Sequence, residues 1–252
     1  FLHDALPIWH ENNGDWFWWG QPHCTPAEFK SLFRFTVEYL RDVKGVHNFL
    51  YCFSPNQGTA SFTRETYLET YPGDDIIDIL AMDSYDWGDP TWVDRTRTSL
   101  QTIILLSEEK GKLAAFSEVG WSNGLSNCDD DQWFSNVLLR TIRDDPFARR
   151  VTYVLTWRNA HYDHFWVPFP GHQNAQDFLD FYNDDFTAFQ DTIPEMYGEV
   201  DTYPIPRDIA ADNLIFMLIN QASFVVLIII VILYSFTRFK RHKNNTRMGD
   251  DA

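Results

Sequence analysis

Residues 76–118 read IIDILAMDSYDWGDPTWVDRTRTSLQTIILLSEEKGKLAAFSE, and this stretch decides the fold class. It holds two short apolar runs, Ile76–Met82 and Leu113–Phe116, which have the length of buried strands. Between them, Trp92–Lys110 has apolar residues at helical spacing, and Gly111 follows as a candidate C-cap. Strand, helix and strand in this order predict a parallel sheet with helices outside it.

The same alternation extends over most of the chain. Thr25-Pro26-Ala27-Glu28 is a clear helix start, because Thr can cap the helix, Pro suits its first turn and Glu completes a capping box. The predicted strands are Ala5–Trp9, Asn48–Phe53, Ile76–Met82, Leu113–Phe116 and Val151–Thr156, and the predicted helices lie near residues 26–43, 92–110, 130–143 and 174–190. Strands and helices at this spacing predict an α/β fold, the second part of a (β/α)8 TIM barrel.

Polar and aromatic residues come directly after each predicted strand. The clusters are His10-Glu11-Asn12-Asn13, Ser54-Pro55-Asn56, Asp83-Ser84-Tyr85-Asp86, Ser117-Glu118 and Trp157-Arg158-Asn159. Any one of them alone could be an ordinary loop. Because parallel strands bring their carboxyl ends to one rim, we expect the five clusters to converge on one site.

Glu11 and Glu118 each end one of these strands. Two carboxyl groups that face each other across a rim are what glycoside hydrolysis requires. At a separation of ~5–5.5 Å one acts as nucleophile and configuration is retained, whereas at a wider gap a water attacks. Glu11 lies among aromatic residues, where burial would raise its pKa and suit it to donate a proton. Glu118 needs hydrogen-bond donors that keep it ionised.

Several of these segments resemble one known family. Trp9–Gly20, which reads WHENNGDWFWWG, resembles the acid/base motif of glycoside hydrolase family 26, the β-mannanase family of the (β/α)8 clan. Phe116–Gly120, FSEVG, resembles the nucleophile motif of that family. Residues 53–56 (FSPN), 82–86 (MDSYD) and 155–159 (LTWRN) match further blocks in the family's order. The resemblance implies that the chain holds only the C-terminal portion of the barrel, strands 4–8.

The resemblance also implies a reaction and roles for the matching residues. The reaction is retaining, endo-acting hydrolysis of β-1,4-mannan-type polysaccharide by double displacement, with Glu11 as acid/base and Glu118 as nucleophile. The implied substrate-binding residues are His10 beside the acid/base, Trp16 as a wall, Trp157 as the floor under the sugar, Tyr85 as a hydrogen-bond donor to the nucleophile, and Asp83 in support of the same region. Aromatic faces suit the apolar faces of sugar rings, and Tyr supplies a donor.

Two departures from the family pattern leave other functions open. Pro7 stands where family members carry an Arg three residues before the His-Glu pair. Barrel strands 1–3 are absent, so we expect residues 1–190 alone to leave a sheet edge exposed and to be neither stably folded nor active. The alternatives are a non-catalytic cell-surface polysaccharide-binding protein, a family member that acts on β-1,3-xylan or mixed-linkage β-glucan, and a barrel remnant.

The C-terminal end has the pattern of a membrane anchor. Leu214–Phe236 is 23 residues long without a formal charge, enough to span a hydrocarbon core of ~30 Å. The basic residues that follow are expected to be cytoplasmic. Because the chain begins with Phe and shows no signal peptide, we interpret it as a fragment. We therefore expect an extracellular or lumenal partial hydrolase domain at 1–191, a linker at 192–213, one transmembrane helix at 214–236 and a cytoplasmic tail at 237–252.

Composition narrows the partners and cofactors. Without the segment from residue 213 onward, 15 basic and 34 acidic residues remain, a net charge of −19. Such a surface argues against nucleic acid and anionic polysaccharide and leaves a neutral β-linked polysaccharide as partner. The three cysteines, Cys24, Cys52 and Cys128, are too few for a disulfide scaffold; Cys52 is expected to be a buried thiol. No HExxH or CxxC pattern occurs, so we expect neither a metal nor another cofactor.

Overall fold

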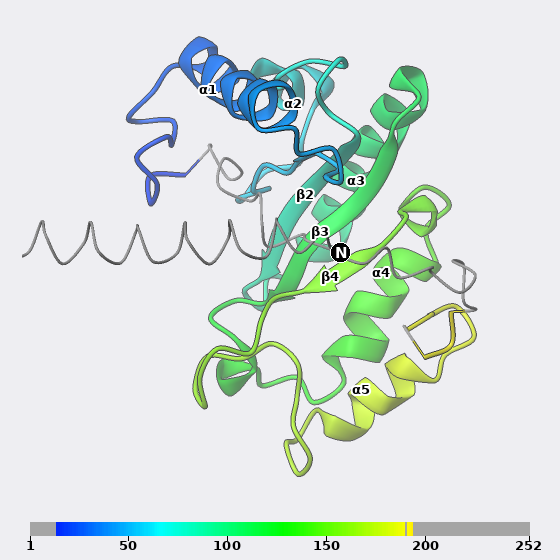
Figure 1. Cartoon of the computed structure of the whole chain (residues 1–252). Coiled ribbons are helices and arrows are strands. Elements are labelled where there is room, and N and C mark those ends of the chain that lie inside the picture. The colour runs from blue at the N-terminus through cyan, green and yellow to red at the C-terminus, as the bar shows by residue number, and fades with distance from the viewer. Residues whose placement is uncertain (1–13, 190, 194–252) are drawn as a thin grey trace, which may run out of the picture. The chain divides into compact units, whose positions relative to one another are not determined.

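Four parallel strands form the sheet of this computed structural model, which describes residues 14–189 and 191–193 (Figure 1). The strands are β1 (Cys52–Phe53), β2 (Ile79–Asp86), β3 (Leu113–Trp121) and β4 (Val154–Thr156). They lie in the order β1-β2-β3-β4, and each is hydrogen-bonded in parallel to the next along the chain. The described residues up to Thr192 belong to one unit of the chain, Phe1–Thr192.

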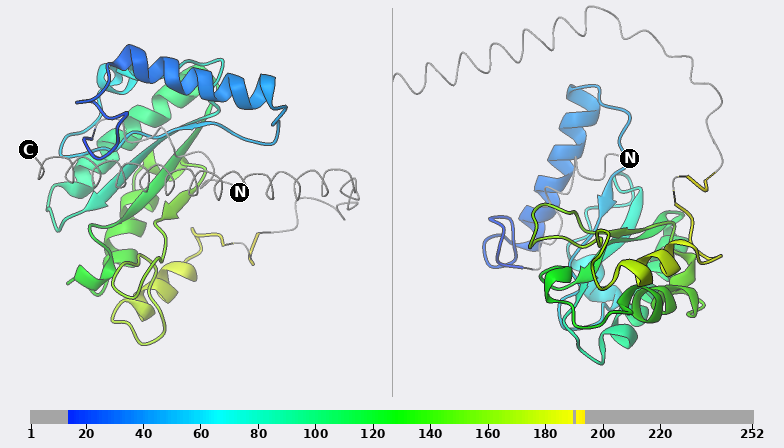
Figure 2. Two further views of the ribbon diagram at one scale, coloured as in Figure 1. Left: turned by 60° about the vertical axis from the view of Figure 1, so that its left-hand side comes forward. Right: turned by 90° about the horizontal axis from the view of Figure 1, so that it is seen from below.

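Helices precede β1, connect the successive strands and follow β4. They are α1 (Pro26–Glu38), which continues as a π-helix over Tyr39–Val43, α2 (Arg64–Glu69), α3 (Trp92–Lys110), a π-helix over Trp133–Leu139 that leads into α4 (Arg140–Arg143), and α5 (Ala175–Tyr182). Short 3₁₀ turns lie at Leu125–Asn127 and Ala148–Arg150. The views in Figures 1 and 2 place α1 at the β1 end of the sheet and α5 at the β4 end.

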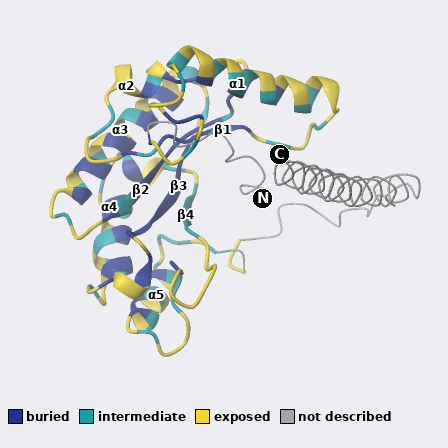
Figure 3. Cartoon of the chain, turned by 90° about the vertical axis from the view of Figure 1, so that its left-hand side faces the viewer, coloured by how far each residue is buried: buried dark blue, intermediate teal, exposed yellow. Residues whose placement is uncertain are grey.

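The hydrophobic core lies between the sheet and the helices. Leu80 and Met82 of β2 and Phe116 of β3 pack there with Leu100 and Ile103 of α3, all of them fully buried. Figure 3 shows the buried residues gathered where the strands meet α3 and α4.

The alternating residues of the same strands form a small second cluster. Ile79, Ala81 and Ala115 are buried on the other face of the sheet, with Cys52 and Tyr153 partly buried against them. In a closed barrel this second face would line the interior.

The predicted parallel order of the strands is confirmed, but their bounds differ. β2 and β3 continue four and five residues beyond the apolar runs that predicted them, to Asp86 and Trp121. The polar clusters at 83–86 and 117–118 therefore lie inside strands rather than in loops, because the backbone ladder does not stop where the side chains become polar. β1 and β4 are shorter than predicted, and each pairs with a single neighbour among the described residues. The predicted strand Ala5–Trp9 lies outside the described residues.

Helix predictions from local signals agree best with the structure. α3 has the predicted bounds, with Gly111 as its C-cap at φ +64°, and the capping box of Thr25 and Glu28 is present. The helix predicted near 130–143 begins at Trp133, the one near 174–190 ends at Tyr182, and α2 was not predicted.

Two further expectations can be compared with the structure. All three cysteines are free thiols, and Cys52 is partly rather than fully buried because it lies on the second face of the sheet. In the part of the chain that the structure describes, no helix has the length and apolar character needed to cross a membrane. The predicted span 214–236 lies outside that part.

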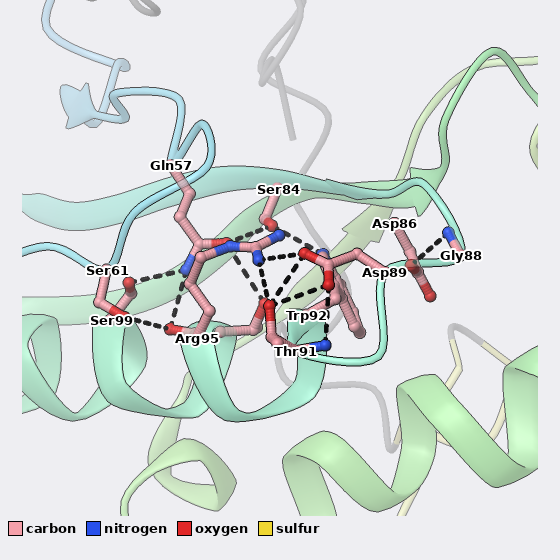
Figure 4. A network of polar contacts seen from close by, with 11 residues as sticks. Gln57, Ser61, Ser84, Asp86, Gly88, Asp89, Thr91, Trp92, Arg95 and Ser99 are labelled. Atoms are coloured by element: carbon pink, nitrogen blue, oxygen red, sulfur yellow. Dashed lines mark hydrogen bonds and ion pairs between the residues drawn. The ribbon is translucent and has the colours of Figure 1, made fainter.

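A buried polar network on the helix side fixes the loops at the carboxyl ends of β1 and β2 (Figure 4). The Gln57 amide nitrogen donates to Arg95 O (2.9 Å) and Ser99 Oγ (2.7 Å), and its oxygen accepts from Ser84 Oγ (2.6 Å). The Gln57 backbone N–H donates to Asp83 O at 2.8 Å. One side chain thus ties the segment after β1 to both β2 and α3.

The second half of this network fixes the loop between β2 and α3. The Arg95 guanidinium, 8% exposed, donates to Asp89 Oδ2 at 2.5 Å and to Thr91 Oγ1 at 3.1 Å. Asp86, at the end of β2, accepts from Gly88 N and from the indole of Trp133. Burial raises the pKa of Asp86. The loop is therefore held at both of its ends.

Replacing Gln57 tests how much this network stabilises the fold. Gln57→Leu keeps the side-chain size but leaves buried partner groups without hydrogen bonds, so we expect the free energy of unfolding to fall by about 3 kcal/mol. Gln101→Leu, on the exposed side of α3, is the matched control and should change it by less than about 0.5 kcal/mol. Chemical denaturation measures both, and equal losses in the two variants would contradict the prediction.

The ion pair at Asp89 predicts a dependence of stability on pH. The hydrogen bond from Arg95 lowers the pKa of Asp89 to about 2. Since this value lies below the ordinary value near 3.8, the stabilisation is present above the ordinary pKa and is lost as the pH falls through about 2. Asp89→Asn should therefore lower the Tm at pH 7 by much more than at pH 2, where about half of the Asp89 carboxyl groups are protonated. Exposed Asp129→Asn serves as control, and an equal Tm difference at the two pH values would show that charge is not the cause.

Candidate functional site

The predicted site residues of β2, β3 and β4 meet at the carboxyl ends of these strands. Asp83 and Tyr85 are in β2, Glu118 is in β3, and Trp157 directly follows β4. The Trp157 backbone N–H donates to the carbonyl of Val119, the residue after Glu118, at 3.3 Å. Glu11 and His10 lie outside the described residues.

The pairing of β2 with β3 contains a β-bulge at the site. Met82 is paired with Phe116, but the next pair is Asp83 with Glu118, so that Ser117 is an extra residue in β3. Bulges of this kind redirect side chains and occur near active sites.

The bulge turns Glu118 toward Tyr85. Asp83 and Tyr85 are two residues apart in β2 and therefore share a face of the sheet. Ser117 Oγ lies 3.1 Å from Asp83 Oδ1, and Glu118 Oε2 lies 2.6 Å from Tyr85 OH, so both residues of β3 face the same side. Strict alternation would have placed Glu118 on the helix side, where its neighbour Val119 packs in the core. Because β3 contains Ser117, the direction of Glu118 depends on the bulge.

The hydrogen bond from Tyr85 to Glu118 is the central contact of the site. Glu118 is only 4% exposed. At 2.6 Å the Tyr85 hydroxyl donates a short hydrogen bond of the type made to an ionised carboxylate. This contact favours the charged form of Glu118, which is the form that can act as a nucleophile.

Three buried side chains form the base beneath Glu118. Ser54 Oγ donates to Asp83 Oδ1 at 2.6 Å and lies 2.6 Å from Ser117 Oγ. Ser117 Oγ also lies 3.0 Å from the carbonyl oxygen of Met82. Since Asp83 is 1% exposed, these contacts link it to the strand that carries Glu118. Ser54 and Ser117 were part of the predicted clusters, but the sequence did not single them out.

Aromatic residues also follow β2 and β4 at the carboxyl ends of these strands. Trp157 is half-buried, with the guanidinium of Arg158 5.6 Å from the centre of its ring system. Trp87 follows β2 directly and is 69% exposed. Such faces can stack on sugar rings.

Trp16 lies in the segment before α1 and is 54% exposed. Trp19 of the same segment is buried and stacks on Phe17, with ring centroids 4.2 Å apart. The tryptophan-rich segment therefore divides its aromatic residues between packing and exposure.

Sequence reasoning missed Trp166, which is buried against Tyr85 with ring centroids 6.1 Å apart. It comes from the long segment between β4 and α5, where no regular pattern placed it near the site. The only signal in the sequence was Gly120, because a residue without a side chain inside β3 indicates a close approach of another group.

Among the described residues, no group of three or more His, Cys, Asp or Glu side chains is arranged to hold a metal ion.

Comparison with known proteins identifies the family. The model of glycosyl hydrolase family 26 matches residues 6–137. A mannan endo-1,4-beta-mannosidase of Bifidobacterium adolescentis is 36% identical over 160 residues, which cover 60% of this chain and 16% of that protein.

Solved structures give the same result. The chain is similar to a Cellulomonas fimi endo-beta-1,4-mannanase double mutant, with 44% identity and a TM-score of 0.69 over 74% of this chain and 42% of that one. It is also similar to a GH26 beta-mannanase from Bacteroides ovatus, with 34% identity and a TM-score of 0.63 over 75% of this chain and 54% of that one. The chain thus spans only part of each relative. Since the family model covers more than half of its 252 residues, the chain belongs to glycosyl hydrolase family 26.

Proposed function

We propose that this chain acts as part of a retaining, endo-acting glycoside hydrolase that cleaves β-1,4-mannan-type polysaccharide. The observation that carries the proposal is the contact between Tyr85 OH and the buried Glu118 carboxylate at 2.6 Å, at the carboxyl ends of adjacent parallel strands. The names of the similar bifidobacterial and Cellulomonas proteins support mannan as the polymer.

In the proposed reaction Glu118 is the nucleophile and Glu11 the acid/base. The Glu118 carboxylate attacks the anomeric carbon while Glu11 gives its proton to the departing glycosidic oxygen. Water then attacks the glycosyl-enzyme ester, Glu11 takes the proton of this water, and Glu118 is released as carboxylate. Before the attack, the Tyr85 hydroxyl stabilises the negative charge of the Glu118 carboxylate. This charge is lost as Glu118 forms the ester with the sugar.

We propose that the polymer is held mainly by aromatic faces and a few polar groups. Trp157 forms the floor under the sugar at the cleavage point, Trp16 a wall, and His10 a contact beside the acid/base. Asp83 supports the residues that contact the sugar, because its buried carboxylate accepts hydrogen bonds from Ser54 and Ser117. A net charge of −16 over the whole chain is compatible with a neutral polysaccharide.

The test compares Glu118→Gln with Glu69→Gln in the full-length protein, on galactomannan, β-1,3-xylan and mixed-linkage β-glucan. The full-length protein here is residues 1–252 joined to barrel strands 1–3, since residues 1–190 alone are expected to be inactive. Glu69 is an exposed carboxylate at the end of α2, so its replacement controls for the loss of a charge. We expect release of reducing ends from galactomannan, reduced roughly 10³-fold or more by Glu118→Gln and unchanged by Glu69→Gln.

Other outcomes of this assay would select another function. Release from xylan or glucan instead would keep the chemistry and replace the substrate. Polymer binding without release would favour a polysaccharide-binding protein, for which Pro7 in place of the usual Arg is the supporting observation, and Pro7→Arg would then be the first reversion.

We also propose that residues 214–236 form a single transmembrane helix, with the hydrolase part outside or in a lumen and residues 237–252 in the cytoplasm. The support is 23 residues without a formal charge, followed by five basic residues between 238 and 247. The full-length protein should remain in the membrane pellet after alkaline carbonate extraction, and deletion of residues 214–252 should release it. Release of the intact protein by carbonate would contradict an anchor.

A further inference from the structure

Trp166 is buried but packs outside the two hydrophobic clusters of the described residues. It is 5% exposed, yet neither core cluster of the described residues includes it. Its ring instead meets Tyr85 edge-on, with centroids 6.1 Å apart and an interplanar angle of 65°. The His164 ring packs against Trp166 at 4.6 Å and 89°. A large aromatic side chain is thus buried against the residue that donates a hydrogen bond to Glu118.

Gly120 provides the space for the Trp166 indole. A Cβ atom at position 120 would lie 2.0 Å from Trp166 Cδ1. Gly120 is two residues after Glu118 in β3, and both therefore point to the same face of the sheet. The indole lies over the backbone of this strand, where any side chain at 120 would displace it.

Two sets of hydrogen bonds fix Trp166 in this place. Its indole N–H donates to the carbonyl oxygen of Trp121 at 2.8 Å. Asn159 Oδ1 accepts from the backbone N–H groups of Trp166 and Val167 at 2.9 Å each, and Asn159 Nδ2 donates to Val167 O at 2.8 Å. Asn159 comes two residues after Trp157, so the same segment that carries the proposed sugar-binding floor also holds Trp166.

We propose that Trp166 is a positioning residue, which holds the Tyr85 ring where its hydroxyl meets Glu118, with Gly120 as the space that admits it. This inference rests on the proposed function, in which Glu118 is the nucleophile. Trp166 acts through Tyr85 and restricts the tilt of its ring. Without this restraint the 2.6 Å contact of Tyr85 with Glu118 is one of several positions open to the phenol.

The experiment uses the full-length protein and five single variants. Trp166→Ala removes the ring, Trp166→Phe keeps an aromatic edge but not the N–H, and Gly120→Ala displaces the indole from the other side. Phe165→Ala is the matched control, because Phe165 is the neighbouring residue, is also 5% exposed, and packs on Phe169 and His172 rather than on Tyr85. Tyr85→Phe serves as the reference for loss of the hydroxyl contact.

We expect Trp166→Ala and Gly120→Ala to lower kcat on galactomannan about tenfold, with KM nearly unchanged. The acidic limb of kcat/KM should move to higher pH in both, as in Tyr85→Phe, because Glu118 loses the donor that favours its ionised form. Trp166→Phe should recover most of kcat. The double variant Trp166→Ala with Tyr85→Phe should be no slower than Tyr85→Phe, since both changes remove one contact. Phe165→Ala should lower the Tm and leave the pH profile unchanged.

Crystal structures of the variants test the inference without any substrate. In crystal structures of the Trp166→Ala and Gly120→Ala proteins, Tyr85 OH should lie outside hydrogen-bond distance of Glu118. An unchanged contact in either variant would overturn the inference, as would a loss of kcat that adds to that of Tyr85→Phe. If the parent protein releases no sugar, the hydrolase proposal fails, while the crystal structures still decide the role of Trp166. If Trp166→Ala does not fold, Gly120→Ala gives the same answer.

Discussion

Backbone pairing between β2 and β3 continues from Ile79 and Leu113 to Asp86 and Trp121, well beyond the apolar part of either strand. The first half of this ladder buries Leu80, Met82 and Phe116 under α3, which stabilises the sheet. The second half carries the polar residues, and it is rigid because it belongs to the same ladder. Asp83, Tyr85 and Glu118 are therefore held by a sheet rather than by loops, which suits chemistry that needs side chains placed within fractions of an ångström.

At this end of β2, the side chains on the two faces of the sheet have different roles. Ser84 and Asp86 point to the helix side, where they join Gln57 and the indole of Trp133. Asp83 and Tyr85 point to the other side, toward Ser117 and Glu118. Each polar residue at this end of β2 thus has its own set of partners, and the helix-side contacts fix the strand that the site-side contacts use.

The features that the sequence predicted correctly are those that depend on local signals and on the order of the strands and helices along the chain. The bounds of α3, the capping box at Thr25 and the parallel order of the strands all agree with the structure. The hydrogen bond between Tyr85 and Glu118 is present as well, but the family resemblance, rather than a local signal, implied it. The bulge at Ser117 could not be predicted, because a shift in pairing depends on both strands at once. Trp166 could not be placed either, since the chain between β4 and α5 has no regular pattern, and the full burial of Asp83 follows from Ser54 and Ser117, far apart in sequence.

The extra residue in β3 has a consequence for how this site can change over time. Deleting Ser117 would restore plain alternation and keep Glu118 opposite Asp83, on the face that it already occupies. The deletion would remove no apolar residue of the core, but Asp83 and Ser54 would lose the Ser117 hydroxyl as a partner. A single three-nucleotide deletion would therefore keep the fold and the direction of Glu118, while it removes one support of the buried carboxylate beside it.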